Sequence, residues 1–133
     1  MSHALVTALR KIYAEWARGN FRAGLELLDP GIVFETFTAD EGPVRARGLA
    51  ELEQRIRQTL NFVWSEFRVE AEDFIDAGDK LLVIGRVRGR GRGSDIKLDA
   101  PVFMAWTFRD RWAVRQQWFA ERTEALEAAG LRE

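Results

Sequence analysis

The residues that could carry out chemistry in this chain are few in kind. Its 133 residues contain no cysteine and a single histidine, His3, close to the N-terminus. Thiolate nucleophiles, disulfides, thiolate metal sites and triads that need an internal histidine are therefore excluded. Acid–base chemistry falls to Asp, Glu, a buried lysine or the single tyrosine, Tyr13, with arginine as an electrophile.

Composition sets the class of protein. The formal net charge is −1, from 20 Lys and Arg against 21 Asp and Glu, and 47% of the residues are hydrophobic, which is typical of one globular domain over residues 1–133. The N-terminal residues lack the pattern of a signal peptide, and the longest aliphatic run, 81–84, is too short for a membrane span. We therefore expect a cytoplasmic protein without a membrane partner.

Cofactor sites leave recognisable patterns that this sequence lacks. It has no glycine-rich phosphate loop between a strand and a helix, and no cluster of metal-ligand residues. We therefore expect neither an organic cofactor nor a metal.

Hydrophobic spacing predicts the elements that must position these residues. Helical periodicity covers 5–16, a short helix is predicted over 21–28, and a third helix carries Leu49, Leu52, Ile56 and Leu60. A strand is predicted over 32–37, followed by a polar loop that contains Gly42. From residue 66 the period changes to two, which predicts antiparallel strands at 66–76, 80–92, 96–109 and 112–121, and a last helix follows over 121–129.

Helices followed by a long antiparallel sheet indicate an α+β fold in which a curved sheet wraps around the N-terminal helices and leaves a cavity. The segment 101–108 is apolar on both faces, and the helices cover one of them. We therefore expect a homodimer through the outer face of the sheet.

The whole pattern resembles the nuclear-transport-factor-2-like superfamily, in its SnoaL-like and ketosteroid-isomerase-like branch. The residues that carry the likeness are the segments 13–21, 27–34, 47–48, 74–79, 86–91, 106–110 and 124–131. The resemblance implies a cone-shaped sheet whose open end holds a small, mostly apolar molecule. It implies no single reaction, because isomerases, cyclases, dehydratases, epoxide hydrolases and non-catalytic members share the fold.

The resemblance also locates the positions at which the isomerase branch does its chemistry. The position of the base falls on Thr36, which is no base, and its neighbour Glu35 should face the opposite side unless a bulge turns it inward. Tyr13 is one step from the position of the oxyanion tyrosine, and is either a cavity donor or a core tyrosine. Met104 stands where an acid would be expected, so the isomerase pair is missing.

An arginine-rich strand offers a second candidate site. Asp99 could join Arg86 or Arg88 in the manner of an epoxide hydrolase, although a cross-strand surface ion pair is the favoured interpretation. The arginine–glycine run 86–93 superficially resembles a nucleic-acid tract. Alternation places its arginines on one face of a hairpin near acidic neighbours, so no nucleic-acid partner is expected.

The remaining candidates form an apolar cup around a ligand. The resemblance implies that Val114, Gln116, Trp118 and Ala120 point inward, with Thr36 and Gln116 as the polar members that would orient the ligand. The full set of predicted ligand-binding residues is Trp16, Phe34, Thr36, Met104, Gln116 and Trp118. Catalysis of the isomerase, cyclase or dehydratase type would require Glu35, Tyr13 or Asp99. The alternative is a non-catalytic binding protein or a dimeric interaction module.

Overall fold

Most of the chain forms an antiparallel sheet, in which one pair of neighbouring strands is parallel. The computed structural model describes residues 1–38, 42–58 and 64–131. The expected third helix included Leu60, which lies outside these residues. The elements, in chain order, are α1 (His3–Trp16), the 3-10 turn η1 (Leu25–Leu27), β1 (Leu28–Thr38), β2 (Gly42–Arg47), α2 (Leu49–Gln58), β3 (Trp64–Asp76), β4 (Lys80–Gly91), β5 (Lys97–Arg109), β6 (Trp112–Phe119) and α3 (Arg122–Ala128).

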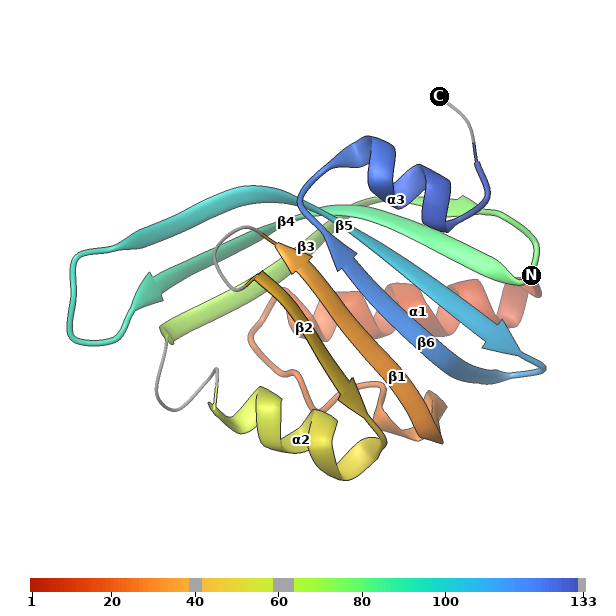
Figure 1. Cartoon of the computed structure of the whole chain (residues 1–133), viewed down its shortest axis with the longest axis horizontal. Helices are drawn as coiled ribbons and strands as arrows, with labels where there is room; N and C mark the ends of the chain where they lie inside the picture. The colour runs from red at the N-terminus through yellow and green to blue at the C-terminus, as the bar shows by residue number, and fades with distance from the viewer. Residues whose placement is uncertain (39–41, 59–63, 132–133) are drawn as a thin grey trace.

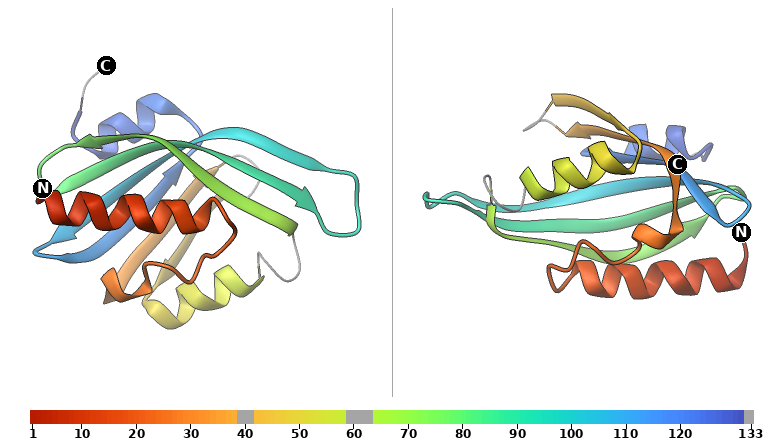
Figure 2. Two further views of the ribbon diagram at one scale, coloured as in Figure 1. Left: turned by 180° about the vertical axis from the view of Figure 1, so that it is seen from behind. Right: turned by 90° about the horizontal axis from the view of Figure 1, so that it is seen from below.

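The six strands form one curved sheet in the order β2-β1-β6-β5-β4-β3 (Figure 1). β1 runs parallel to β6, and all the other neighbours are antiparallel. Figure 2 shows α1 lying across one face of the sheet, with α2 beneath β1 and β2, while α3 lies on the opposite face. The α+β fold with a curved sheet around the N-terminal helices is therefore confirmed.

The first helix follows its apolar spacing closely. Ser2 caps it, because its side chain accepts a hydrogen bond from the backbone N–H of Leu5 at 3.2 Å. One stripe of the helix packs against the inside of the sheet, because its apolar residues recur every three or four positions. The buried members are Leu5, Leu9, Ile12, Tyr13 and Trp16.

The helix predicted over 21–28 does not form. Residues 21–24 make turns, η1 adds three residues of 3-10 helix, and β1 already begins at Leu28. Gly24 explains the interruption, because its φ of +95° is left-handed and a Cβ there would lie 2.9 Å from Cγ2 of Ile12. The segment is therefore not helical, and it packs closely against the end of α1.

The loop expected around Gly42 is instead β2, an edge strand. It pairs with β1 so that Val44 lies opposite Thr36 and Ala46 lies opposite Phe34. Six residues that begin with Gly-Pro give a weak strand signal, and their pairing with β1 supplies the stabilisation that the local sequence lacks.

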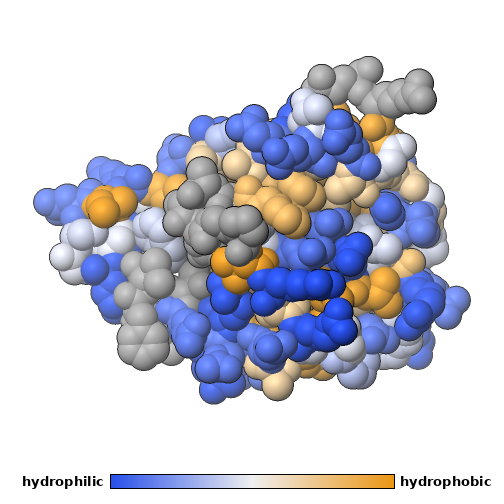
Figure 3. All heavy atoms as spheres, viewed as in Figure 1, coloured by the Kyte–Doolittle hydropathy of each residue, from blue (hydrophilic) through white to orange (hydrophobic). Residues whose placement is uncertain are grey.

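The outer face of the sheet is partly covered by the chain itself. α3 lies against it, and a second apolar cluster joins Leu82, Phe103, Ala105, Phe119, Ala125, Leu126 and Ala129. This explains why the middle of β5 is buried on both faces. Figure 3 views this side, where hydrophilic side chains gather over β1, β2 and β6.

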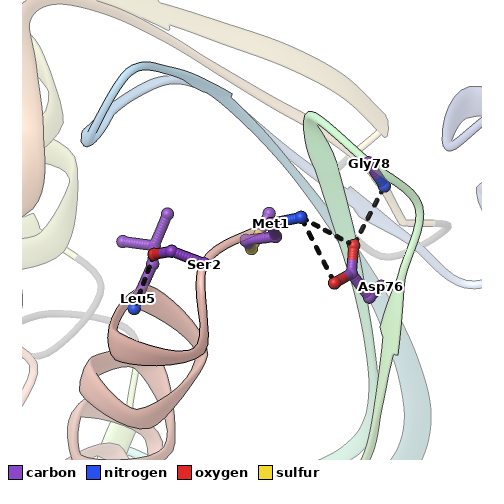
Figure 4. Close-up of polar contacts among 5 residues, drawn as sticks. All are labelled: Met1, Ser2, Leu5, Asp76 and Gly78. Carbon is purple, nitrogen blue, oxygen red and sulfur yellow. Dashed lines mark hydrogen bonds and ion pairs between the residues drawn. The ribbon is translucent and has the colours of Figure 1, made fainter.

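The chain start is tied to the β3–β4 turn. The amino group of Met1 lies 3.3 Å from Oδ2 of Asp76, and Oδ1 of Asp76 accepts the backbone N–H of Gly78 at 2.9 Å (Figure 4). The Gly78 hydrogen bond, together with the amino group, lowers the pKa of Asp76. These contacts hold the beginning of α1 against the sheet. In the described residues, no helix is long and apolar enough to cross a membrane.

Candidate functional site

A pocket of about 310 Å³ lies on the inner side of the sheet. Trp16 at the end of α1, the 21–28 segment and α2 form one wall, and strands β1 and β3–β6 form the others. Most of the described lining is aromatic or aliphatic, including Phe21, Leu25, Ile56 and Phe67. Such a surface offers water few hydrogen bonds, so the pocket favours an apolar molecule.

The floor of the pocket is a small array of paired strand positions. Phe34 of β1 lies opposite Gln116 of β6, and Thr36 lies opposite Trp118. On the far side of β6, Gln116 pairs with Trp106 of β5. Because alternate residues of a strand share a face, these side chains all meet the pocket.

Five of the six predicted ligand-binding residues therefore lie together on the wall: Trp16, Phe34, Thr36, Gln116 and Trp118. Ala120 joins them. Trp16 and Trp118 have ring centroids 6.3 Å apart, and Phe34 meets Trp118 edge-on at 6.0 Å. These contacts hold the rings in fixed positions around the cavity.

Val114 departs from the predicted alternation. The β5–β6 register shifts between Thr107 and Phe108, so Phe108 pairs with Ala113. This bulge places Ala113 in the inner core and turns Val114 toward a groove on the outer face. The prediction that Val114 faces inward is therefore wrong.

Tyr13 and Met104 lie behind the pocket rather than on its wall. The indole Nε1–H of Trp106 donates to Oη of Tyr13 at 2.7 Å, and Oη donates to Sδ of Met104 at 3.3 Å. Tyr13 is 2% exposed. Burial raises the pKa of the Tyr13 hydroxyl far above its usual value, and the Trp106 hydrogen bond offsets this only in part. The arrangement is that of a core tyrosine whose hydroxyl is satisfied.

Glu35 points away from the pocket, to the outer face of β1. Its Oε1 lies 3.3 Å from Nε of Arg115, and its Oε2 lies 4.0 Å from Nε of Arg45. Regular pairing of β1 with both neighbours from Val33 onward keeps strand alternation intact here, and no bulge turns the carboxylate inward. The geometry gives Glu35 two cationic neighbours on the outer face of the sheet.

Asp99 lies among charged side chains on the exposed face of the hairpin arm. It pairs with Arg86 and, at 3.9 Å, with Arg88, whose Nε is 2.5 Å from Glu70 of β3. These are cross-strand ion pairs, since Arg88 lies opposite Asp99 in the register. The arginines are thus matched by acids from both neighbouring strands, outside the pocket.

Of the uncharged polar side chains on the pocket wall, Gln116 has a hydrogen-bond partner and Thr36 has none. Nε1 of Trp118 donates to Oε1 of Gln116 at 2.6 Å. Thr36 is 5% exposed, and its Oγ1 is buried without a hydrogen-bond partner. An unpartnered hydroxyl beside a cavity is a position where a ligand or water could complete the bonding.

Sequence reasoning missed the contribution of α2. Arg55 and Ile56 reach the pocket from this helix, and Arg55 is the one charged residue among the described lining residues. The sequence did contain a signal for this contribution. Leu52 and Ile56 are four residues apart, so they lie on the inward-facing side of α2, and Arg55 lies next to them. Within the described residues, no three acidic or histidine side chains come close enough to hold a metal ion.

Comparison with solved structures supports the fold. A nuclear-transport-factor-2-like protein of unknown function from Burkholderia pseudomallei shares 19% identity, with a TM-score of 0.77 over 96% of this chain and 97% of that one. A protein with a ketosteroid-isomerase-like fold from Catenulispora acidiphila, in complex with trimethylamine, shares 17% identity, with a TM-score of 0.72 over 99% and 96% of the two chains.

A third solved structure, a proposed SnoaL-like polyketide cyclase from Jannaschia sp., shares 16% identity, with a TM-score of 0.72 over 97% of this chain and 93% of that one. No curated protein sequence matches the chain. The SnoaL-like domain, however, matches residues 9–116, which run from the middle of α1 into β6 and include most of the pocket wall. The chain therefore belongs to the SnoaL-like domain family.

Proposed function

We propose that this protein binds a small, mostly apolar molecule in the inner pocket. The observation that carries the proposal is a cavity of about 310 Å³ walled by aromatic and aliphatic side chains, with a few polar groups on its floor. This volume is near the lower end of the range for small-molecule sites, so the guest would be about the size of a few fused rings. Burial of apolar surface would supply most of the binding free energy, at roughly 25 cal/mol per Å².

Binding is favoured over acid–base catalysis by the position of the candidate catalytic groups. Glu35 and Asp99 are engaged with arginines away from the pocket, and the hydroxyl of Tyr13 is enclosed between Trp106 and Met104. Among the described lining residues there is no Asp, Glu, His or Tyr. General acid–base catalysis needs such a group within hydrogen-bond reach of the substrate.

The family supports a ligand of the size that cyclases and isomerases handle. The Jannaschia structure is a proposed polyketide cyclase, and the alignment covers 97% of this chain and 93% of that one. At 16% identity that likeness concerns the fold, so it supports a shared kind of cavity rather than a shared reaction.

The test is calorimetric titration with fluorene, a flat hydrocarbon without polar atoms. We expect one molecule to bind per chain with a negative heat-capacity change, which marks apolar burial. Ala100 lines the pocket opposite Val87, so Ala100→Phe would fill the cavity and abolish binding. Ala4 is exposed on α1, and Ala4→Phe is the matched control that retains binding. Equal binding by both variants would place the ligand elsewhere and overturn the proposal.

A further inference from the structure

We propose that Gln116 and Thr36 select for ligands that present a hydrogen-bond acceptor, such as a carbonyl oxygen, to the floor of the pocket. The inference rests on the proposed binding function and adds a specificity to it. Trp118 acts here as a positioning residue, because it fixes which end of the Gln116 amide is offered to the ligand.

The orientation of the Gln116 amide follows from its neighbour. An indole N–H is a donor only, so the atom that it meets at 2.6 Å must be the amide oxygen. The reversed amide would set two donors against each other. Oε1 therefore already accepts one hydrogen bond from Trp118, whereas the NH₂ group is left with no acceptor among the described residues. Gln116 is 4% exposed and lines the pocket, so its free donor belongs to the cavity.

Thr36 supplies a second unused group on the same floor. It lies opposite Trp118 on β6. It is two residues along β1 from Phe34, which lies opposite Gln116. Its buried Oγ1 has no partner, which costs folding free energy in the empty protein. Rotation about χ1 exchanges the hydroxyl with the methyl group, which brings a donor to the cavity surface.

The other side chains of the described wall add hydrogen-bond donors and no carboxylate acceptor. Its charged residue, Arg55, carries donors only, and the carboxylates Glu35 and Asp99 lie outside the pocket. A ligand whose polar atom accepts hydrogen bonds would satisfy the free donors of Gln116 and Thr36. A ligand whose polar atom only donates would lose its hydration and meet, at Gln116, only an oxygen that already accepts from Trp118.

Three tricyclic probes of nearly equal shape test this selection: fluorene without a polar atom, fluorenone with an acceptor, and carbazole with a donor. We expect fluorenone to bind about tenfold more tightly than fluorene in calorimetric titration, and carbazole to bind no more tightly than fluorene. Tryptophan fluorescence quenching gives a second measure of each affinity.

Substitutions assign the preference to these residues. Gln116→Met keeps the length of the side chain and should remove most of the preference for fluorenone over fluorene, measured as the ratio of the two affinities in the same variant. Gln117 is the next residue on β6 and lines the outer groove, so Gln117→Met is the matched control and should retain the preference. Thr36→Val should weaken fluorenone binding and raise the melting temperature of the empty protein, because it removes the unpartnered hydroxyl.

The positioning role of Trp118 has its own readout. Trp118→Phe frees the amide to turn its oxygen toward the cavity, so carbazole should gain affinity relative to fluorenone. Equal affinities for fluorene and fluorenone in the native chain, or an unchanged preference in Gln116→Met, would overturn the inference and leave the proposed function standing. Failure of all three probes to bind would overturn both. If Thr36→Val does not fold, the comparison of Gln116→Met with Gln117→Met decides.

Discussion

The indole of Trp106 and the hydroxyl of Tyr13 form a buried hydrogen bond at 2.7 Å, between residues 93 positions apart in the chain. It joins α1 to β5 directly behind the inner pocket. The hydroxyl of Tyr13 in turn donates a hydrogen bond to Sδ of Met104 at 3.3 Å. The three side chains thus satisfy one another inside an otherwise apolar core.

Removing the Tyr13 hydroxyl should destabilise the fold. Tyr13→Phe leaves the buried N–H of Trp106 without an acceptor, at a cost of about 1–3 kcal/mol. Urea unfolding followed by circular dichroism measures this loss. Met104→Leu is the comparison, because it removes only the weak sulfur acceptor and should cost less. Equal stability of Tyr13→Phe and the native chain would contradict the assigned role of this bond.

High pH should weaken the protein through the same residue. The unfolded phenol ionises near pH 10, at about its model value. Burial raises the pKa of Tyr13 in the folded state, so the unfolded chain releases the proton first. The contribution to stability is therefore complete below about pH 10 and falls above it, by up to about 1.4 kcal/mol per pH unit.

Tyr13→Phe isolates this effect from the titration of lysines. The difference in unfolding free energy between the native chain and the variant should shrink as the pH rises above about 10. Tyr13 is the single tyrosine, so tyrosinate absorbance reports on it alone. Ionisation of the folded protein near pH 10, where an exposed phenol titrates, would contradict the buried placement.

Gly24 should tolerate a side chain less well than Gly78. Both have left-handed φ values, +95° and +86°, which cost an alanine about 1–2 kcal/mol. A Cβ at Gly24 would also meet Ile12 at 2.9 Å, whereas nothing lies within 4 Å of one at Gly78. Gly24→Ala should therefore lose about 1–3 kcal/mol more than Gly78→Ala in urea unfolding. Equal losses would show that the 21–24 segment packs less closely against α1.

The homodimer stays a prediction, and Phe37 offers its test. This side chain is 37% exposed on β1 and stacks on Phe119, with ring centroids 5.0 Å apart. If the outer face pairs with a second copy, Phe37→Asp should convert a dimer to a monomer in light scattering. Ile96→Asp replaces another exposed apolar side chain, 64% exposed at the hairpin arm, and should leave the dimer intact. A monomeric native chain at micromolar concentration would refute the expectation.

Much of the fold could be predicted from the sequence because its signals are local. The 3.6-residue spacing of apolar residues located α1, and the alternation from residue 66 onward located β3 to β6. Alternation also groups Phe34 with Thr36 and Gln116 with Trp118, and the resemblance to the family assigned both pairs to the inner face, where the pocket has them. Each of these features depends on the geometry of a single helix or strand, which a few neighbouring residues determine.

The features that were missed depend on contacts between distant segments. β2 exists through its pairing with β1, Gly24 breaks a predicted helix to approach Ile12, and a bulge opposite Phe108 turns Val114 outward. α3 covers a face of β5 that we had expected a second subunit to cover.

The sequence by itself therefore determined the residue types that are present, the periods of its elements and the family that they resemble. Only the tertiary structure decided that Tyr13 meets Trp106, that Trp118 occupies the oxygen of Gln116, and that Glu35 and Asp99 pair with arginines outside the pocket. The reason is physical. A hydrogen bond or ion pair requires two side chains to meet within a few ångströms, and strand register and sheet curvature, set by the whole chain, decide which ones do.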